Sequence, residues 1–486
     1  MNAEHSYLDA LQLDRGQRVP LHRQIYERMR SAIEQRMLQP GDRVASARAL
    51  ASELGVARST VEAAYQQLTG EGYLVARGQA GTVVSAHLPP PVSRAAGPRT
   101  VDRHSRKHSS ALPNALPQGT APPPFQLGTP ALDAFPRKQW TRLTARRLRM
   151  TSTADMFYGD PCGYGPLRQA IATYLLVSRG IACRPEQVFV TAGYRASLAF
   201  VVRTLLKPGD RVWTEDPCYP PTRDVLEHAG DRPVAIPVDS EGMLVAHGIR
   251  HAPKARMAVV TPSHQAPLGV SLTLPRRLQL LDWASRTNAW IVEDDYDGEY
   301  RYSGAPLPAL KSLDAHDRVI YAGSFSKTLY PGLALGYLVV PERLVDTCIE
   351  AARTWSNGCP QITQATVADF MSAGHFSRHL KKMRLLYARR RAMLVAALAA
   401  VFGEKVRVDL TSGGMHLIAR FTSRVGDREL ARRAQQAGLN AQSLSGRYAA
   451  RRGHSHSDKG LLLGFTNIAS ADEAMRLCTR LRDVLK

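Results

Sequence analysis

The sequence lacks any cysteine pattern that would hold a metal ion or a set of disulfides. Its six cysteines, at positions 162, 183, 218, 348, 359 and 478, include no Cys-x-x-Cys pair and no nearby group of histidines. Zinc sites and disulfide frameworks depend on such spacing. We therefore expect no metal site, and we interpret the cysteines as reduced thiols of a cytoplasmic protein.

Long apolar segments are also absent. The N-terminus is polar and mixed in charge, and no stretch reaches the roughly 18 uncharged apolar residues that a membrane span requires. Secretion and membrane insertion are therefore not expected. The chain has 486 residues, of which 44% are hydrophobic, and this length favours two or three domains.

Acidic residues are scarce, and the resulting net charge of +22 is unevenly distributed. Residues 1–85 contain ten arginines, no lysine and nine acids, for a net charge of +1, and residues 86–124 carry a net +4. The remaining +17 belongs to the rest of the chain. The total favours a polyanionic partner, but any DNA-binding part has to be recognised from local pattern.

The first 85 residues have the pattern of a helix-turn-helix. Apolar residues recur every fourth position over 20–37, which predicts a helix that ends before Pro40-Gly41. A second helix is expected over 46–54, with Ser46 as its N-cap, and a third over 58–68. Residues 73–84 predict a two-stranded wing. This order suits insertion into a DNA major groove, although a plain three-helix bundle with a hairpin has the same periodicity.

Residues 86–124 are rich in proline, with Pro-Pro-Pro twice and a basic run at 103–108. Such a composition buries too little apolar surface to offset the entropy of ordering. We expect a mobile tether, whose basic run is either solvated or in contact with DNA phosphates.

A single lysine stands out in the remaining chain. Lys327 lies between an apolar strand and a Pro-Gly turn, with hydroxyls at Ser324, Ser326 and Thr328. This setting suits a Schiff base to an aldehyde cofactor, because hydroxyls can donate to a phosphate and burial keeps the amine nucleophilic. The alternative is a surface lysine in a serine-rich loop, which would show the same short Ser-x-Ser-Lys pattern.

Two further segments favour pyridoxal 5'-phosphate as that cofactor. A strand over 289–293 ends in carboxylates, where α/β sheets bind ligands. The carboxylate of Asp294 would keep the pyridine nitrogen protonated, and Tyr296 would donate near the ring oxygen. The strand at 187–192 ends at Gly193, and the helix that follows presents free N–H groups to a phosphate.

Together these segments resemble the fold-type I aminotransferases, and nearly the whole chain resembles the MocR/GabR-type transcription regulators. The resemblance implies an α/β protein with a GntR-type winged helix-turn-helix at 1–85, a linker at 86–124 and an aminotransferase-like domain at 125–486. That domain would have a mostly parallel central sheet and a smaller α+β C-terminal part, with strands within 406–421 and 461–465. We also expect one long amphipathic helix over 363–391, with a basic face.

The resemblance implies a homodimer that binds operator DNA and senses pyridoxal phosphate or a small amino-acid-like effector. Tyr219 would stack on the pyridine ring, Tyr158 would reach the phosphate in the neighbouring subunit, and Arg447 would hold the effector's carboxylate. The other residues implied for the cofactor are Tyr194, Arg195 and His264. Those implied for DNA are Arg43, Ser46, Arg48, Arg58, Ser59, Thr60, Gly81 and Thr82.

The chain departs from the aminotransferase pattern at three positions. Ala266 replaces an asparagine that bonds to the ring oxygen, Ala334 replaces an arginine that grips the phosphate, and Pro221 replaces an arginine that selects short amino acids in some relatives. Loss of one charge-assisted bond weakens binding about 10- to 100-fold, unless Arg195 substitutes. We therefore expect a regulator with at most vestigial catalysis. An active aminotransferase with a DNA-binding appendage and a cofactor-free dimeric scaffold are the alternatives.

Overall fold

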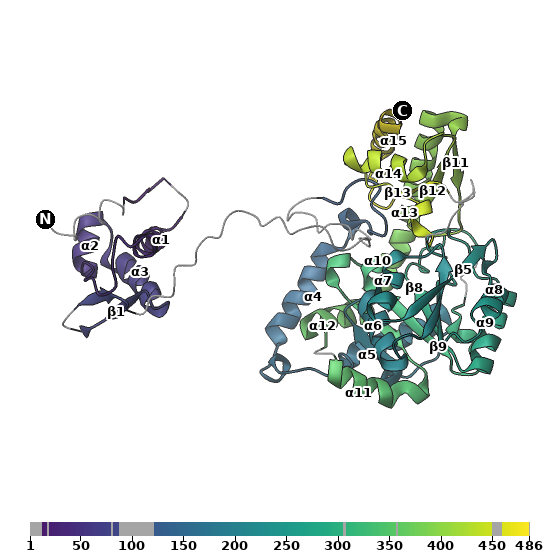
Figure 1. The fold of residues 1–486 in the computed structure, drawn as a ribbon, viewed down its shortest axis with the longest axis horizontal. Helices are drawn as coiled ribbons and strands as arrows, with labels where there is room; N and C mark the ends of the chain where they lie inside the picture. Colours follow the sequence, from purple (N-terminus) through teal and green to yellow (C-terminus); the bar gives the residue numbers. More distant parts are fainter. Residues whose placement is uncertain are drawn as a thin grey trace. The chain divides into compact units, whose positions relative to one another are not determined.

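The computed structural model describes residues 12–16, 19–78, 81–86, 121–304, 308–355, 358–449 and 459–485. It consists of two compact units, residues 1–107 and 108–486 (Figure 1). The tether expected over 86–124 lies outside the described residues except for position 86 and positions 121–124. Within the described residues, no helix combines the length and apolar character needed to cross a bilayer.

The N-terminal unit has the expected order of three helices and a wing. The serine hydroxyl of Ser46 accepts the N–H of Ala49 at 3.1 Å and so caps the second helix, which ends at Gly55 with a left-handed φ of 60°. The apolar faces of the helices enclose one core that includes Ile25, Leu50 and Val61. The elements are α1 (Leu21–Glu34), α2 (Ala47–Leu54), α3 (Arg58–Gly70), β1 (Leu74–Ala76) and β2 (Thr82–Val84).

The large unit is built on an eight-stranded sheet in the order β3-β10-β9-β8-β7-β4-β5-β6. Strands β4, β5, β7, β8 and β9 run parallel, whereas β10 and β6 are antiparallel to their neighbours. The strands are β3 (Val188–Thr191), β4 (Arg211–Asp216), β5 (Arg232–Asp239), β6 (Gly242–Met243), β7 (Met257–Val260), β8 (Trp290–Asp295), β9 (Val319–Ser324) and β10 (Gly336–Val339).

Helices cover both faces of this sheet, which explains why its strands are apolar at almost every position. Val212 packs with residues of α6, α7 and α11, while its neighbour Trp213 points to α8 and α9 and stacks on Trp283 with ring centroids 3.8 Å apart. The helices are α4 (Arg137–Met150), α5 (Gly165–Arg179), α6 (Tyr194–Leu205), α7 (Pro220–His228), α8 (Val245–His251), α9 (Leu274–Thr287) and α11 (Val345–Trp355).

A smaller four-stranded antiparallel sheet, in the order β11-β12-β14-β13, lies at one end of the large unit with α14 and α15 (Figure 1). The predicted run over 406–421 is a hairpin of two strands. The elements are β11 (Val406–Asp409), β12 (His416–Phe421), α14 (Asp427–Gln436), β13 (Gln442–Ser443), β14 (Leu461–Gly464) and α15 (Ala471–Leu485).

The prediction of one helix over 363–391 is wrong. The segment forms two helices, α12 (Gln361–Ser372) and α13 (His375–Phe402), because Gly374 adopts a left-handed φ of 70° between them. Arg390, assigned to a solvated basic face, is instead buried. Its guanidinium pairs with Asp133 and donates to the carbonyl of Thr466.

Candidate cofactor, effector and DNA sites

Lys327 lies in the one-turn helix α10 (Phe325–Thr328), directly after β9. Its Nζ donates to the carbonyl of Gly128 at 2.9 Å, and the Tyr300 hydroxyl donates to the carbonyl of Lys327 itself at 3.1 Å. The Ser324 hydroxyl accepts the N–H of Ser326 at 3.2 Å, which shapes the turn into the helix. The amine is therefore held at the carboxyl edge of the sheet, as expected from the sequence.

The electrostatics around the amine favour reaction with an aldehyde. Burial lowers the pKa of Lys327, and the carboxylates of Asp297 and Asp294 oppose that shift. Burial also raises the pKa of Asp294 well above its usual value, with further repulsion from Asp295 and Asp297. A cationic ring nitrogen would remove this penalty by giving the Asp294 charge a partner, while a lysine with a lowered pKa is a better nucleophile.

Tyr296 and His264, both predicted to bind the cofactor, lie next to each other at the end of β8. His264 Nδ1 lies 3.0 Å from the Tyr296 hydroxyl and 3.1 Å from a carboxylate oxygen of Asp297. Within the described part of the chain, the other ring nitrogen, Nε2, is buried and has no hydrogen-bond partner. Burial, then the charges of Asp297 and Asp294, raise the pKa of Tyr296 well above its usual value, so its hydroxyl stays a donor.

Tyr219 is the residue before α7 and is 41% exposed, so its side chain is accessible to a ligand. The ring of Tyr194 lies 6.1 Å away, and its hydroxyl is 2.8 Å from the hydroxyl of Thr222. The Tyr194 phenol therefore reaches toward α7. Only its backbone N–H belongs to the helix start that the sequence suggested as a phosphate site.

That helix start lies against the turn that carries Ala334. Gly193, with a φ of 93°, precedes α6, and the register pairs Gly336 with Thr191. A Cβ on Gly336 would come within 3.0 Å of the Gly193 Cα, so the two segments are in direct contact. Arg195, in the first turn of α6, is half-buried, and its guanidinium makes no hydrogen bond or ion pair with any described residue.

Arg447 ends the 3-10 turn Ser445–Arg447 of the smaller part and donates to Gln442. Its backbone is tied to the Tyr219 segment, because the N–H of Cys218 and a guanidinium N–H of Arg223 both donate to the Arg447 carbonyl, at 3.3 and 3.0 Å. Burial lowers the pKa of Arg447, the nearby Tyr219 opposes this, and the like charge of Arg223 lowers it further.

The loop that carries His264 is fixed by a buried acid. Glu215 accepts the N–H and the hydroxyl of Thr261 at 3.2 and 2.5 Å, and it accepts the Gln265 amide at 3.2 Å. Burial raises the pKa of Glu215 to about 7, against the effect of these hydrogen bonds. Because its bonds run to neighbouring strands and loops, Glu215 shapes the site without forming part of its lining.

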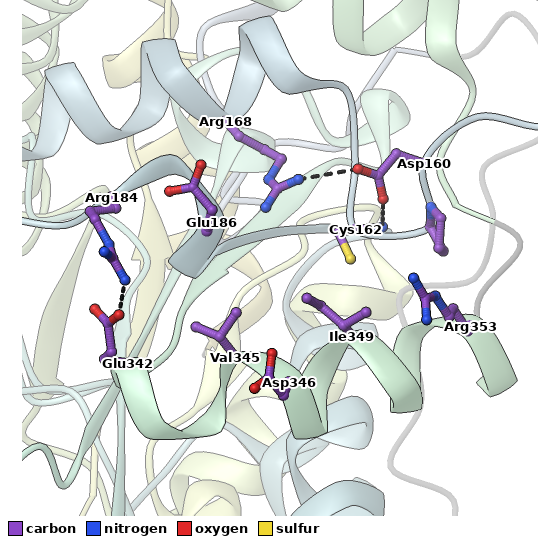
Figure 2. A pocket seen from close by; sticks show the side chains of 11 residues that line it. Asp160, Cys162, Arg168, Arg184, Glu186, Glu342, Val345, Asp346, Ile349 and Arg353 are labelled. Carbon is purple, nitrogen blue, oxygen red and sulfur yellow. Dashed lines mark hydrogen bonds and ion pairs between the residues drawn. The ribbon is translucent and has the colours of Figure 1, made fainter.

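Tyr158 is 84% exposed and contacts the ring of Phe157 at 5.3 Å. Among the described contacts, none joins its hydroxyl to Lys327 or the other cofactor residues of the same chain. A pocket of about 660 Å³ lies next to this loop, and Figure 2 shows Arg168 bonded to Asp160 and Arg184 bonded to Glu342 across it. No predicted cofactor residue lines that pocket.

The predicted DNA residues lie on α2, α3 and the wing. Arg58 and Ser59 are exposed at the start of α3, and Arg58 Nε is 2.7 Å from Glu62. Arg43 lies over the wing turn, since a Cβ on Gly81 would come within 2.9 Å of its Nε. Ser46 and Arg48 are exposed at the start of α2, whereas Thr60 and Thr82 are half-buried.

Sequence reasoning missed Gly128, Asp297, Thr222 and Arg223. Gly128 is 199 positions from Lys327, and no local pattern links them. Arg223 had a usable signal, because it follows Tyr219 by four residues, which is one helical turn.

Comparison with known proteins identifies both parts. Residues 21–84 match the gntR family of bacterial regulatory proteins, and residues 127–450 match aminotransferase class I and II. The probable rhizopine catabolism regulatory protein MocR of Rhizobium meliloti is 39% identical over 94% of this chain and 92% of its own length. The chain belongs to the MocR-type transcription regulators.

Other MocR-type relatives include the pyridoxine biosynthesis regulator PdxR of Corynebacterium glutamicum, 32% identical over 91% of both chains. The large unit is similar to the kynurenine aminotransferase of Pyrococcus horikoshii, with a TM-score of 0.67 and 26% identity over 75% of this chain and 91% of that one. LysN of Thermus thermophilus gives a TM-score of 0.66 and 27% identity over 74% and 91%. The fold-class prediction is thus confirmed.

Pyridoxal phosphate is the cofactor of these aminotransferase folds. The residues of this MocR-type regulator fit it: a buried amine at Lys327, a buried acid at Asp294, and the accessible side chain of Tyr219. The guanidinium of Arg195, which has no partner among the described residues, adds a positive group at the helix start. When bound, the cofactor would supply an aldehyde that captures primary amines.

Proposed function

We propose that the large unit of this regulator senses pyridoxal phosphate together with an amine-bearing effector, and that this binding alters the affinity of the winged helix for operator DNA. The observation that carries the proposal is the buried Lys327 amine, with its lowered pKa, beside a buried acid. Burial of such an amine and acid costs free energy, and groups with pKa values shifted in this way are frequent at binding and active sites.

In this proposal, Lys327 holds the cofactor covalently, Asp294 pairs with its ring nitrogen and Tyr219 stacks on the ring. Tyr296 and His264 donate near the ring oxygen, and Arg447 receives the carboxylate of the effector. The DNA-binding domain would be residues 1–85, the tether residues 86–124 and the sensor residues 125–486.

The phosphate would rest on the N–H groups at the start of α6, next to Ser324 and Ser326. Arg195 would bind the phosphate in place of the arginine that Ala334 replaces, because the contact between Gly193 and Gly336 brings the segments of Arg195 and Ala334 together. This half-buried guanidinium has no partner in the part of the chain that the structure describes, so it is available for a phosphate.

We further propose a homodimer working in the cytoplasm. The exposed Tyr158 would complete the phosphate site of the partner subunit, and paired winged helices would read two half-sites. DNA contacts would come from Arg43, Arg48 and Arg58, supported by Ser46, Ser59, Thr60 and the Gly81-Thr82 wing.

The test measures cofactor and DNA binding on the same protein. We expect the full chain to gain a new absorption band in the visible range when pyridoxal phosphate is added, because the ring becomes bound to a lysine, and we expect its operator affinity to change. Lys327→Ala should abolish the band and the cofactor dependence of DNA binding, but leave cofactor-free DNA binding intact. Wild-type protein whose DNA affinity ignores the cofactor would rule out the sensing role, and sustained keto acid production would favour an enzyme.

A further inference from the structure

Arg223 places a second positive charge beside the effector arginine. It lies on α7, one turn after Tyr219, and one of its guanidinium nitrogens donates to the Arg447 carbonyl at 3.0 Å. A second nitrogen of the same guanidinium, Nη1, is buried and has no hydrogen-bond partner in the described part of the chain. Buried donors are almost always paired, so this nitrogen requires an explanation.

Among the described residues, neither Arg223 nor Arg447 forms an ion pair with an acid. The nearby Asp216 instead accepts the N–H of Ala449 at 2.7 Å. Two like charges held close together, one of them with a vacant buried N–H, are stabilised by an anion that reaches both.

The surroundings define what kind of anion fits. Cys218 lies close enough to interact electrostatically with both guanidinium groups, and Tyr219 does so with that of Arg447. Tyr219 is also 41% exposed, so a ligand can reach it. A single carboxylate would satisfy Arg447 alone. A ligand with a second anionic group a few bonds away would also engage Arg223.

We propose that the effector is an acidic amino acid or a similar dianion, with its α-carboxylate at Arg447 and its second anionic group at Arg223. Arg223 then determines specificity, because it favours ligands with two negative charges over their neutral amides. This inference rests on the proposed effector site, but its anion-binding step does not require chemistry at Lys327.

The experiment compares matched ligand pairs on the full chain loaded with pyridoxal phosphate. Glutamate is compared with glutamine, and aspartate with asparagine, by the change in the cofactor absorption band. Glutarate is compared with butyrate by calorimetry, because these ligands carry no amine. We expect glutamate or aspartate to bind at least about 10-fold more tightly than its amide, the usual range for one charge-assisted bond.

Arg223→Gln should reduce that preference to less than about 3-fold, and Arg223→Lys should retain part of it. Arg232→Gln, an exposed arginine on β5, serves as the control. Equal affinities for acid and amide in wild-type protein, or a preference that survives Arg223→Gln, would overturn the inference. If no cofactor band forms at all, the proposed function fails, and the glutarate and butyrate comparison still decides the role of Arg223.

Discussion

Gly128→Ala should displace the Lys327 amine. Gly128 has a φ of 64°, and a Cβ there would lie 2.7 Å from Nζ and 3.3 Å from Cε of Lys327. A left-handed backbone costs a non-glycine residue about 1–2 kcal/mol. The amine sits at the end of a flexible side chain, so it can move aside, but it then loses its bond to the Gly128 carbonyl, worth about 1 kcal/mol.

We therefore expect Gly128→Ala to lower the free energy of unfolding by about 2–3 kcal/mol and to weaken pyridoxal phosphate binding about 10-fold. In a Lys327→Ala background, only the backbone cost of about 1–2 kcal/mol should remain. The double-mutant cycle should thus show a coupling of about 1 kcal/mol. Denaturant unfolding measures the energies, and absorbance titration measures cofactor affinity.

Gly332→Ala is the control, because Gly332 lies five residues after Lys327 and a Cβ there would come no closer than 3.8 Å to another atom, Tyr330 Cδ2. It should change stability by less than about 0.5 kcal/mol. Additive effects of the two substitutions, together with unchanged cofactor binding in Gly128→Ala, would show that Gly128 does not position the amine.

Three further outcomes follow from the geometry. Arg179→Met should cost about 3–5 kcal/mol in urea unfolding, because its buried guanidinium lies 2.8 Å from Asp295, whereas Arg286→Met, in an exposed pair, should cost about 0.5 kcal/mol or less. Burial lowers the pKa of His379 to about 4. The unfolded histidine takes up a proton near about pH 6.5 and the folded one does not, so the free energy of unfolding should fall by about 2 kcal/mol between about pH 6.5 and 5. His379→Gln should remove this fall. If the variant shows the same pH dependence of stability, other groups cause it. Arg58→Ala should reduce the slope of log DNA affinity against log salt concentration by about 1. The same reduction in Arg23→Ala, whose side chain is in the same kind of helical ion pair, would exclude a specific DNA contact by Arg58.

The sequence alone determined the local elements and indicated the lysine that we propose as the reactive group. Periodicity marked α1, and the serine at position 46 and the glycine at position 55 marked the ends of α2, because capping and amphipathic patterns act over a few residues. Lys327 and Asp294 were identifiable because parallel strands end at one edge of a sheet. The break at Gly374 was missed because apolar spacing continues on both sides of it.

Only the tertiary structure decided which distant residues share the site. Gly128 meets Lys327, and Arg223 meets Arg447, across 199 and 224 positions of sequence. Such pairings depend on the packing of whole helices and strands, and no local pattern encodes them. Burial likewise exists only in the folded chain. It lowers the pKa of the Lys327 amine, and it leaves one Arg223 nitrogen without a partner among the described residues.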